Sequence, residues 1–376
     1  MKPYRWLNMF KLKASFGQQG NDNIGDFHYL DTYSIVNTNN KVGLVLSEKG
    51  NPNITWETNN NFNAGFDFEM LNSRLRGSIE YFYKKTTDML CFVFAPYSAG
   101  YKGTYDNIGD MVNNGVEIDL AATVLKTKNI SWDVNVNATT YKNEITKLAD
   151  VLKADLVVDG HPGYSSGDRL YAEGLPIYEW YMPRYAGVSN EGKAMWYYTD
   201  SDGTLKTTDV YGNASYYSCG SPHPDVYGGF GTTLNAYGFD FSISFAYSLG
   251  GLSYDNGYAG YMGPPSGTLG GAAIHKDVLN SWSASNPTSN IPRWQYDDPS
   301  VSAQCDRFLI SGSYLSLQNI NLGYTLPKLW VNKIGLDNIR IYVAADNVYF
   351  WSKRKGFDPR GSFSGGSSTS TYSPTR

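Results

Sequence analysis

The sequence predicts an all-β protein, an antiparallel transmembrane β-barrel with long loops on one side. Two patterns predict it: long segments alternate apolar and polar residues, and the connections between them alternate between short and long. One segment reads Val116-Glu117-Ile118-Asp119-Leu120. Because successive side chains of a strand point to opposite faces, this period of two gives one apolar and one polar face. Strands of about ten residues with this division suit a wall between lipid and a wet lumen.

The composition also favours a membrane barrel over a soluble enzyme. Charged residues make up 18% of the 376 residues, where about 25% is usual, and aromatic residues reach 15%. The sequence has no run of about 18 apolar residues, so we expect no transmembrane helix. A membrane protein built from strands has to close them into a barrel, because lipid satisfies no backbone polar group. The net charge of −4, without a cluster of Lys and Arg, argues against nucleic acid as a partner.

We expect eleven strands, at residues 8–17, 56–70, 73–90, 108–125, 129–147, 175–187, 193–199, 225–237, 239–250, 314–326 and 338–351. The short connections are residues 71–73, 126–129, 189–192, 238 and 327–337. The long connections are residues 18–55, 91–107, 148–174, 200–224, 251–313 and 352 onward. Short turns on one rim and long loops on the other are the arrangement of outer-membrane barrels, whose long loops lie outside the cell.

The alternation also predicts which side chains face lipid. The expected lipid-facing residues are Val116, Ile118, Leu120, Val134, Phe241, Ile243 and Phe245. The expected inward residues are Asp119, Asp133, Asn135, Asp240, Ser242 and Ser244. One strand breaks the alternation, because Leu315 and Leu317 are odd-numbered whereas Ile320 and Leu322 are even-numbered. A β-bulge near Gln318 would restore a single apolar face.

No residue pattern indicates an enzyme or a cofactor. Residues 163–167 read Gly-Tyr-Ser-Ser-Gly, with His161 nearby, and match the pattern of a nucleophile elbow. That motif needs a strand before it and a helix after it, and here it falls in a predicted loop. The cysteines Cys91, Cys219 and Cys305 are far apart and odd in number, so we interpret them as isolated thiols.

A weak candidate for ion binding is the polar segment with Asp200, Asp202 and Asp209. Its carboxylates could supply oxygen ligands at alternate positions. A calcium loop requires about six ligands and ends in a bidentate Glu, which this segment lacks. We therefore expect a polar turn and assign no metal.

The predicted loop at 251–313 is the strongest candidate for contact with a ligand or partner. It carries Tyr254, Trp282, Trp294 and Tyr296 beside Asn and Asp residues. Aromatic rings with amides suit sugar stacking or a protein partner, since loops often carry function. Packing of the loop on itself explains the same residues equally well.

Several segments resemble the barrel of SusC/RagA-type TonB-linked (TonB-dependent) outer-membrane transporters. They occur in the family's order and span nearly the whole chain: LKASFGQQGNDNIG at 12–25, NPNITWE at 51–57, NIGDMVNNGVE at 107–117, SYLSLQNINLGYTLP at 313–327, ADNV at 345–348 and KGFDPR at 355–360. The resemblance implies that residues 1–376 are the C-terminal half of a 22-stranded barrel. By the same comparison we expect the signal peptide, the plug domain and the final strand to lie outside the chain.

The resemblance also implies a function and partners. It implies import of oligosaccharide or peptide across the outer membrane of a Gram-negative, Bacteroidota-like bacterium. Energy would come from TonB–ExbB–ExbD through the N-terminal parts, and a SusD-like surface lipoprotein would cover the barrel, which sits in outer-membrane lipid. The alternative is a surface-exposed β-rich binding protein, an adhesin or lectin, without transport. We also expect that this chain alone cannot transport.

Overall fold

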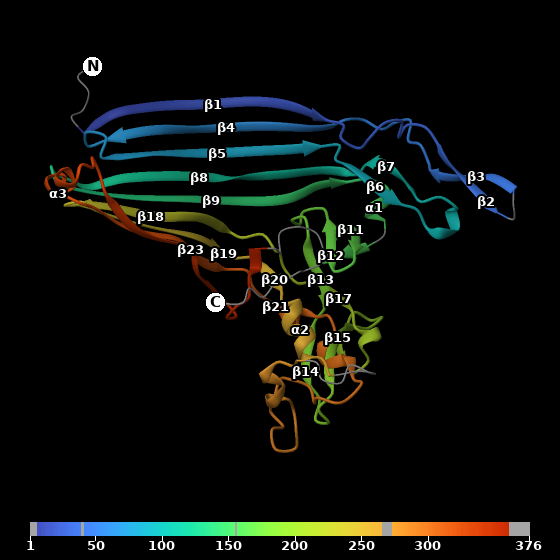
Figure 1. Cartoon of the computed structure of the whole chain (residues 1–376). Helices are drawn as coiled ribbons and strands as arrows, with labels where there is room; N and C mark the ends of the chain where they lie inside the picture. The colour runs from blue at the N-terminus through green and yellow to red at the C-terminus, as the bar shows by residue number, and fades with distance from the viewer. Residues whose placement is uncertain (1–5, 39–40, 155, 265–272, 361–376) are drawn as a thin grey trace.

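The computed structural model describes residues 6–38, 41–154, 156–264 and 273–360. Nine long strands form one antiparallel sheet in chain order (Figure 1). They are β1 (Leu7–Asn21), β4 (Glu57–Met70), β5 (Leu75–Thr87), β8 (Gly109–Lys126), β9 (Ile130–Leu148), β18 (Val226–Ala236), β19 (Phe239–Leu249), β22 (Tyr314–Thr325) and β23 (Arg340–Ser352). Each strand pairs with its neighbour in the sequence of long strands, as in an up-and-down barrel wall.

The register of the sheet separates an apolar face from a polar face across all nine strands. One row of directly paired residues runs through Leu12, Phe66, Ile79, Ile118, Ala138, Gly228, Tyr247, Leu315 and Trp351. The adjacent row, on the other face, runs through Lys13, Gly65, Glu80, Glu117, Thr139, Tyr227, Ser248, Tyr314 and Ser352. A shift of one residue in any strand would move its apolar side chains to the polar face. The separation of the two faces is therefore specific to this register.

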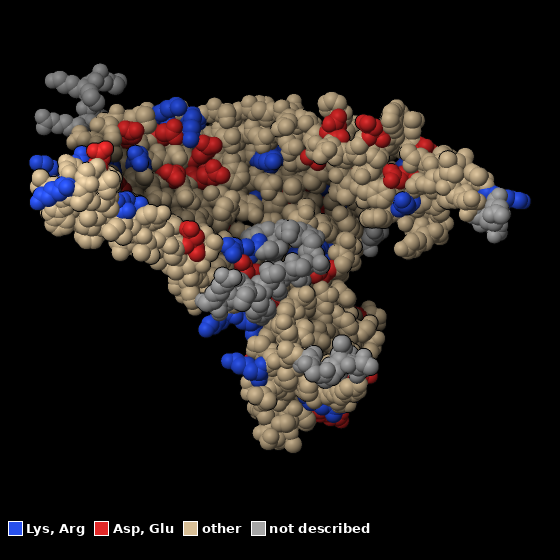
Figure 2. Space-filling view, in the orientation of Figure 1, with Lys and Arg blue, Asp and Glu red and all other residues tan. Residues whose placement is uncertain are grey.

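The predicted assignment of side chains to faces is confirmed. The seven residues expected to face lipid all share the face of the apolar row, and none of them is buried. The six residues expected inward share the polar face. Figure 2 shows Lys, Arg, Asp and Glu gathered on the hollowed face of the sheet. On this polar face, Lys13 Nζ lies 3.0 Å from Asp67 and 2.8 Å from Glu80, so the positive charge of the lysine pairs with the negative charges of the two carboxylates.

The irregularity predicted in the eighth long strand is also confirmed. The pairing of β22 shifts register between Leu317 and Asn319 on its β23 side, and opposite Ser244 and Phe245 on its β19 side. Two residues of the bulge therefore occupy the place of one, as a β-bulge requires. This keeps Leu315 and Ile320 on the same apolar face.

Two of the eleven expected strands do not belong to this sheet. Residues 175–187 include β13 (Glu179–Pro183) and most of β14 (Tyr185–Val188), and residues 193–199 contain β15 (Ala194–Thr199). They lie in small separate sheets, because their apolar residues pack on one another instead of facing lipid. The barrel sheet therefore has nine strands, and residues 149–225 form one long connection. The alternation of short and long connections is preserved.

The first two long connections pair to form an arm beyond the long-loop rim (Figure 1). Its elements are β2 (Thr32–Thr38), β3 (Lys41–Glu48), β6 (Leu90–Phe94), η1 (Tyr97–Ala99) and β7 (Gly103–Asn107). The Lys49 N–H donates to Gly103 O at 3.0 Å, and the Lys102 N–H donates to Ser47 O at 3.0 Å. Segments far apart in the sequence thus share backbone hydrogen bonds.

The other two long connections fold together, and we call the described residues of 149–225 and 251–313 the loop unit. Besides β13, β14 and β15 it contains α1 (Asp150–Lys153), β10 (Leu156–Val158), β11 (His161–Ser166), β12 (Arg169–Ala172), β16 (Leu205–Thr208), η2 (Tyr211–Asn213), β17 (Tyr216–Ser218), β20 (Leu252–Tyr254), α2 (Asn256–Met262), η3 (Lys276–Asn280), η4 (Pro299–Ser302), η5 (Asp306–Phe308) and β21 (Leu309–Ser311). On the opposite rim, α3 (Lys328–Val331) and η6 (Asn332–Ile334) join β22 to β23. Among the described residues, no helix is long and apolar enough to cross a membrane.

Candidate functional site

The loop unit has a hydrophobic core that both of its connections supply. Trp180, Met182 and Trp196 come from the first connection, and Met262 and Phe308 come from the second; all five are almost completely buried. The Trp180 indole N–H donates to Leu252 O at 3.0 Å, which ties the two connections at the centre of the core. The long loops on this part of the rim are therefore a packed structure, in contrast to solvated loops with few internal contacts.

A buried ionic contact fastens the loop unit to the segment that follows β23. Asp255 is fully buried, its carboxylate accepts from the Tyr258 N–H at the start of α2, and Arg354 Nε donates to it at 2.7 Å. The Arg354 guanidinium also lies 3.5 Å from the centre of the Tyr258 ring. The Tyr258 hydroxyl donates to Asp277 at 3.0 Å, and Phe357, three residues after Arg354, is fully buried. The loop unit is therefore joined to the sheet in two ways: through the ends of the strands that it connects, and through the contact of Asp255 with Arg354.

Burial shifts the pKa of several groups of the loop unit. It raises the pKa of the Glu179 carboxyl, although hydrogen bonds from Ser218 Oγ at 2.7 Å and from the Gly220 N–H at 3.0 Å oppose the shift. It raises the pKa of the Cys219 and Cys305 thiols to about 11. Thiols with so high a pKa are mostly protonated at neutral pH, and a protonated thiol is a poor nucleophile.

The structure places the four predicted aromatic contact residues in different environments. Tyr254, predicted to contact a ligand or partner, is only 4% exposed and packs between Trp180 and Phe308, as the alternative of loop self-packing expects. Its position on β20, between the two connections, places it in the core. Trp294 is half-buried and donates from Nε1 to Met262 O at 3.2 Å. Trp282 and Tyr296 lie on the same unit.

Trp282 packs against a turn of the first connection. Gly192 has φ +84° there, and a Cβ on it would lie 2.3 Å from Cε3 of the indole. Trp282 remains partly exposed, and Tyr296 is 62% exposed. The two rings and Trp294 are therefore the predicted contact residues that still reach the surface of the loop unit.

The three aspartates of the weak metal candidate do not form a site. Asp200 pairs with Lys206, and Asp209 accepts from Lys193 Nζ at 2.8 Å. Asp202 accepts from the Thr204 N–H at 2.8 Å. Over the described part of the chain, no group of three or more His, Cys, Asp and Glu could hold a metal ion. The segment is a turn held by ion pairs and backbone hydrogen bonds, and the nearby ammonium of Lys206 lowers the pKa of Asp200.

The segment with the nucleophile-elbow pattern forms a β-hairpin. His161–Ser166 is β11, Gly167 turns the chain with φ +61°, and β12 follows, so no helix carries the serine. The His161 ring nitrogen Nδ1 is 2.7 Å from Glu173 O, to which it donates in one tautomer. This geometry does not assemble a nucleophile with a base.

Sequence reasoning missed Arg354, Asp255 and Tyr258. The contact joins residues that are 99 positions apart, which no local pattern reveals. The available signal was Asp255 directly before a short helix, the position of an N-cap residue.

The geometry defines a class of protein. A curved antiparallel sheet, apolar across one face and polar across its hollow face, with short turns on one rim and folded loops on the other, is the wall of a transmembrane β-barrel. Residues 4–249 match the family described as TonB dependent receptor-like, beta-barrel. The chain belongs to this family.

Individual relatives agree. "TonB-dependent receptor P26" of Formosa agariphila is 29% identical over 94% of this chain and 36% of the relative. "TonB-dependent receptor SusC" of Bacteroides thetaiotaomicron is 29% identical over 96% of this chain and 36% of the relative. The solved structure of the RagAB peptide importer in the "closed-closed" state has a TM-score of 0.79 and 30% identity, over 96% of this chain and 39% of that one. The chain thus spans little more than a third of their length. These relatives are receptors and transporters, not enzymes, as expected.

Proposed function

We propose that this chain is the C-terminal part of the barrel of a TonB-linked nutrient importer in the outer membrane of a Gram-negative, Bacteroidota-like bacterium. The observation that carries the proposal is the pairing register, which keeps one face apolar and the other polar from β1 to β23. Such a sheet is stable with lipid on one side and water on the other. The alignment of the chain with little more than a third of each relative supports a part of a larger receptor.

Within the whole receptor, the residues described above supply wall and loops. Energy for import comes from TonB–ExbB–ExbD acting on N-terminal parts outside this chain, as family membership suggests. The hollow face contributes carboxylates, amides and hydroxyls to the lumen, a surface that suits passage of a hydrated solute.

The partner that we propose for the long-loop rim is a SusD-like surface lipoprotein. In support, the arm carries large apolar side chains that are more than two-thirds exposed, among them Ile35, Val42, Leu44 and Phe94. Apolar patches of this kind are uncommon on a protein surface without a partner. The packed loop unit would offer that partner a preformed surface, which reduces the entropy lost on binding.

The ligand that we propose is an oligosaccharide or a peptide. Trp282, Trp294 and Tyr296 remain the candidate contact residues, since their rings reach the surface of the packed loop unit. Aromatic faces bind both sugar rings and peptide side chains. This proposal excludes Tyr254, because its ring is buried.

Uptake by cells tests the proposed function. Cells that make the whole receptor and its lipoprotein should import labelled oligosaccharide or peptide, and deletion of tonB should abolish import but leave the receptor in the membrane. The double variant Trp282→Ala and Tyr296→Ala should reduce import about tenfold or more, whereas Tyr237→Ala on the opposite rim serves as the control. If the cells bound ligand at the surface but imported none, with or without TonB, the protein would be a surface binding protein of the adhesin or lectin kind.

A further inference from the structure

One connection on the short-turn rim differs from the others. Residues 326–339 join β22 to β23 and contain α3 and η6, whereas residues 71–74, 127–129 and 237–238 suffice for the other hairpins of the sheet. A hairpin needs only two to five residues to reverse the chain. The connection at 326–339 is therefore longer than reversal of the chain requires.

This connection exposes large apolar side chains. Leu329 is 80% exposed, Trp330 is 61% exposed and Ile334 is 65% exposed, and Leu336 is about half exposed. Only Val331 of the short helix is buried, at 1%. The segment thus packs through one residue and presents the rest of its apolar surface outward, which in water is unfavourable.

The position of the connection follows from the length of the apolar band. On β19 the apolar face runs from Phe239 to Leu249, ten steps of about 3.4 Å, or about 24 Å after a tilt of about 45°. This matches the apolar band of about 25 Å in barrels of this class. Phe239 pairs with Tyr324, and their ring centres are 4.4 Å apart. The row of Phe239 and Tyr324 therefore marks one edge of the band, and the connection begins directly beyond it.

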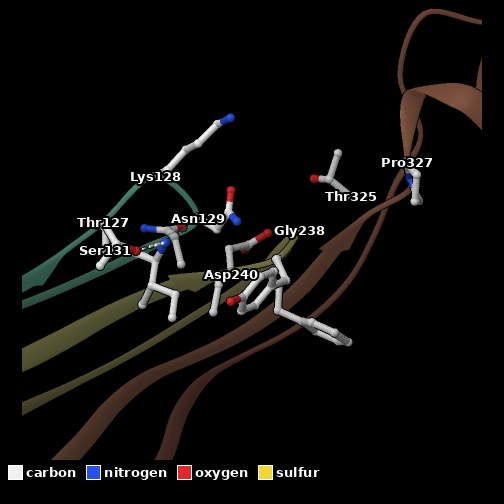
Figure 3. Close-up of a pocket in the computed structure, with 13 residues that line it drawn as sticks. Thr127, Lys128, Asn129, Ser131, Gly238, Asp240, Thr325 and Pro327 are labelled. Atoms are coloured by element: carbon white, nitrogen blue, oxygen red, sulfur yellow. Dashed lines mark hydrogen bonds between the residues drawn. The ribbon is translucent and has the colours of Figure 1, made fainter.

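Neighbouring turns confirm that the connection lies at the rim. Pro327, which precedes α3, lines a shallow depression together with residues of two other short turns, among them Lys128, Asn129 and Gly238 (Figure 3). Figure 3 shows Lys128 extending away from the strands. Lys328 and Lys333 of the connection are exposed as well. Basic side chains thus lie beside the exposed apolar ones at this rim.

We propose that α3 and η6 form an anchor in the membrane interface at the short-turn rim, bound to anionic phospholipid. Leu329, Trp330 and Ile334 lie toward the acyl chains, and Lys328 and Lys333 contact headgroup phosphates. Trp at the interface and Lys beside an apolar face are the residue types that such segments use. The connection follows Thr325, the last residue of β22, and Tyr324 beside it lies on the apolar face that defines the lipid side of the wall. The proposal depends on the barrel lying in a membrane, and it is independent of what the receptor imports.

Depth measurements in nanodiscs test the anchor. The whole receptor, with Cys91→Ser to remove an exposed thiol, is labelled with bimane at Leu329→Cys, at Ile334→Cys or, as the matched control, at Asp337→Cys at the end of the same connection. The discs contain phosphatidylethanolamine and phosphatidylglycerol with brominated acyl chains. We expect quenching by the brominated lipid to be at least about twofold stronger at 329 and 334 than at 337, and iodide to quench only 337 efficiently.

The charge requirement is tested separately. Lys328→Gln with Lys333→Gln should weaken lipid quenching at 329 in phosphatidylglycerol discs and change little in discs of phosphatidylcholine alone.

Strong quenching by iodide at 329 and 334 would show a segment in water and would overturn the proposal. Labels shielded from both iodide and brominated lipid would show a protein surface as the occupant and would overturn it equally. Because positions 329 and 334 are both exposed, either one carries the test if the other variant fails to assemble.

Discussion

At the scale of single residues, Asp255 has a central position in the loop unit. Its carboxylate is fully buried, caps the start of α2 and is in contact with the guanidinium of Arg354. A carboxylate without water around it depends on such partners, because the loss of one leaves a charge in an environment of low dielectric constant. The contact therefore couples the folding of the loop unit to the segment after β23.

We predict that Arg354→Met loosens the loop unit by about 2–4 kcal/mol, since it removes one partner of a buried charge. Hydrogen exchange of α2 in the whole receptor should accelerate by about thirtyfold or more. The control is Arg360→Met, which removes an exposed ion pair with Asp358 two residues away and should change exchange less than about fivefold. Equal exchange in both variants would show that the Arg354 contact does not hold the unit.

Cys219 gives a prediction of pH dependence. Burial disfavours the charged thiolate and raises the pKa of Cys219 to about 11, so about one thiol in a thousand is ionised at pH 8. Because the thiolate reacts, alkylation of Cys219 by iodoacetamide should be about two orders of magnitude slower than that of a free thiol. Its rate should rise about tenfold per pH unit up to about pH 10, as followed by mass spectrometry of the peptide. A plateau near pH 9 would contradict the shift.

At the scale of elements, the long strands could be predicted because their signal is local. The alternation in residues 115–124 and 239–249 determines both the strand and its faces, and the break at Gln318 revealed the bulge. Residues 175–187 were also predicted as a barrel strand, yet they pack in the loop unit. The difference arises from contacts such as Trp180 with Leu252, 72 positions away, which alternation cannot reveal. The burial of Tyr254, predicted as a contact residue, could not be foreseen for the same reason.

The assignment of faces on β19 leads to a matched pair of substitutions. Ile243 lies near the middle of the strand on the lipid side, and its neighbour Ser242 lies on the hollow side. We predict that Ile243→Lys destabilises the whole barrel by about 2–4 kcal/mol, because a charge at the centre of the bilayer loses its hydration. Ser242→Lys should change stability by less than about 1 kcal/mol, since the ammonium stays in the wet lumen. Reversible unfolding in urea measures the stability of both variants. If Ser242→Lys lost more stability than Ile243→Lys, the lipid face and the lumen face would be assigned the wrong way round.

At the scale of the whole molecule, the sheet has two ends that no strand covers among the described residues. β1 and β23 pair on one side only, and almost all of their residues are exposed. The first is 15 residues long and the second is 13 residues long, so each edge presents a long row of backbone groups. In lipid, every such group left without a hydrogen bond is unfavourable by several kcal/mol. Closure therefore requires further strands.

We predict that residues 1–376, expressed alone with a signal peptide added, aggregate and do not insert into the outer membrane. The reason is the pair of open edges, which would associate with other chains as unpaired strands do. Fractionation should find the fragment in aggregates, fully digested by external protease, whereas the whole receptor should give a band that shifts on heating and resists protease. Under the proposed function, coexpression of the rest of the receptor should rescue insertion, because it would supply strands that pair with β1 and β23. A heat-modifiable fragment that supports uptake by itself would show that these nine strands close on their own, and the proposed 22-stranded barrel would then be wrong for this protein.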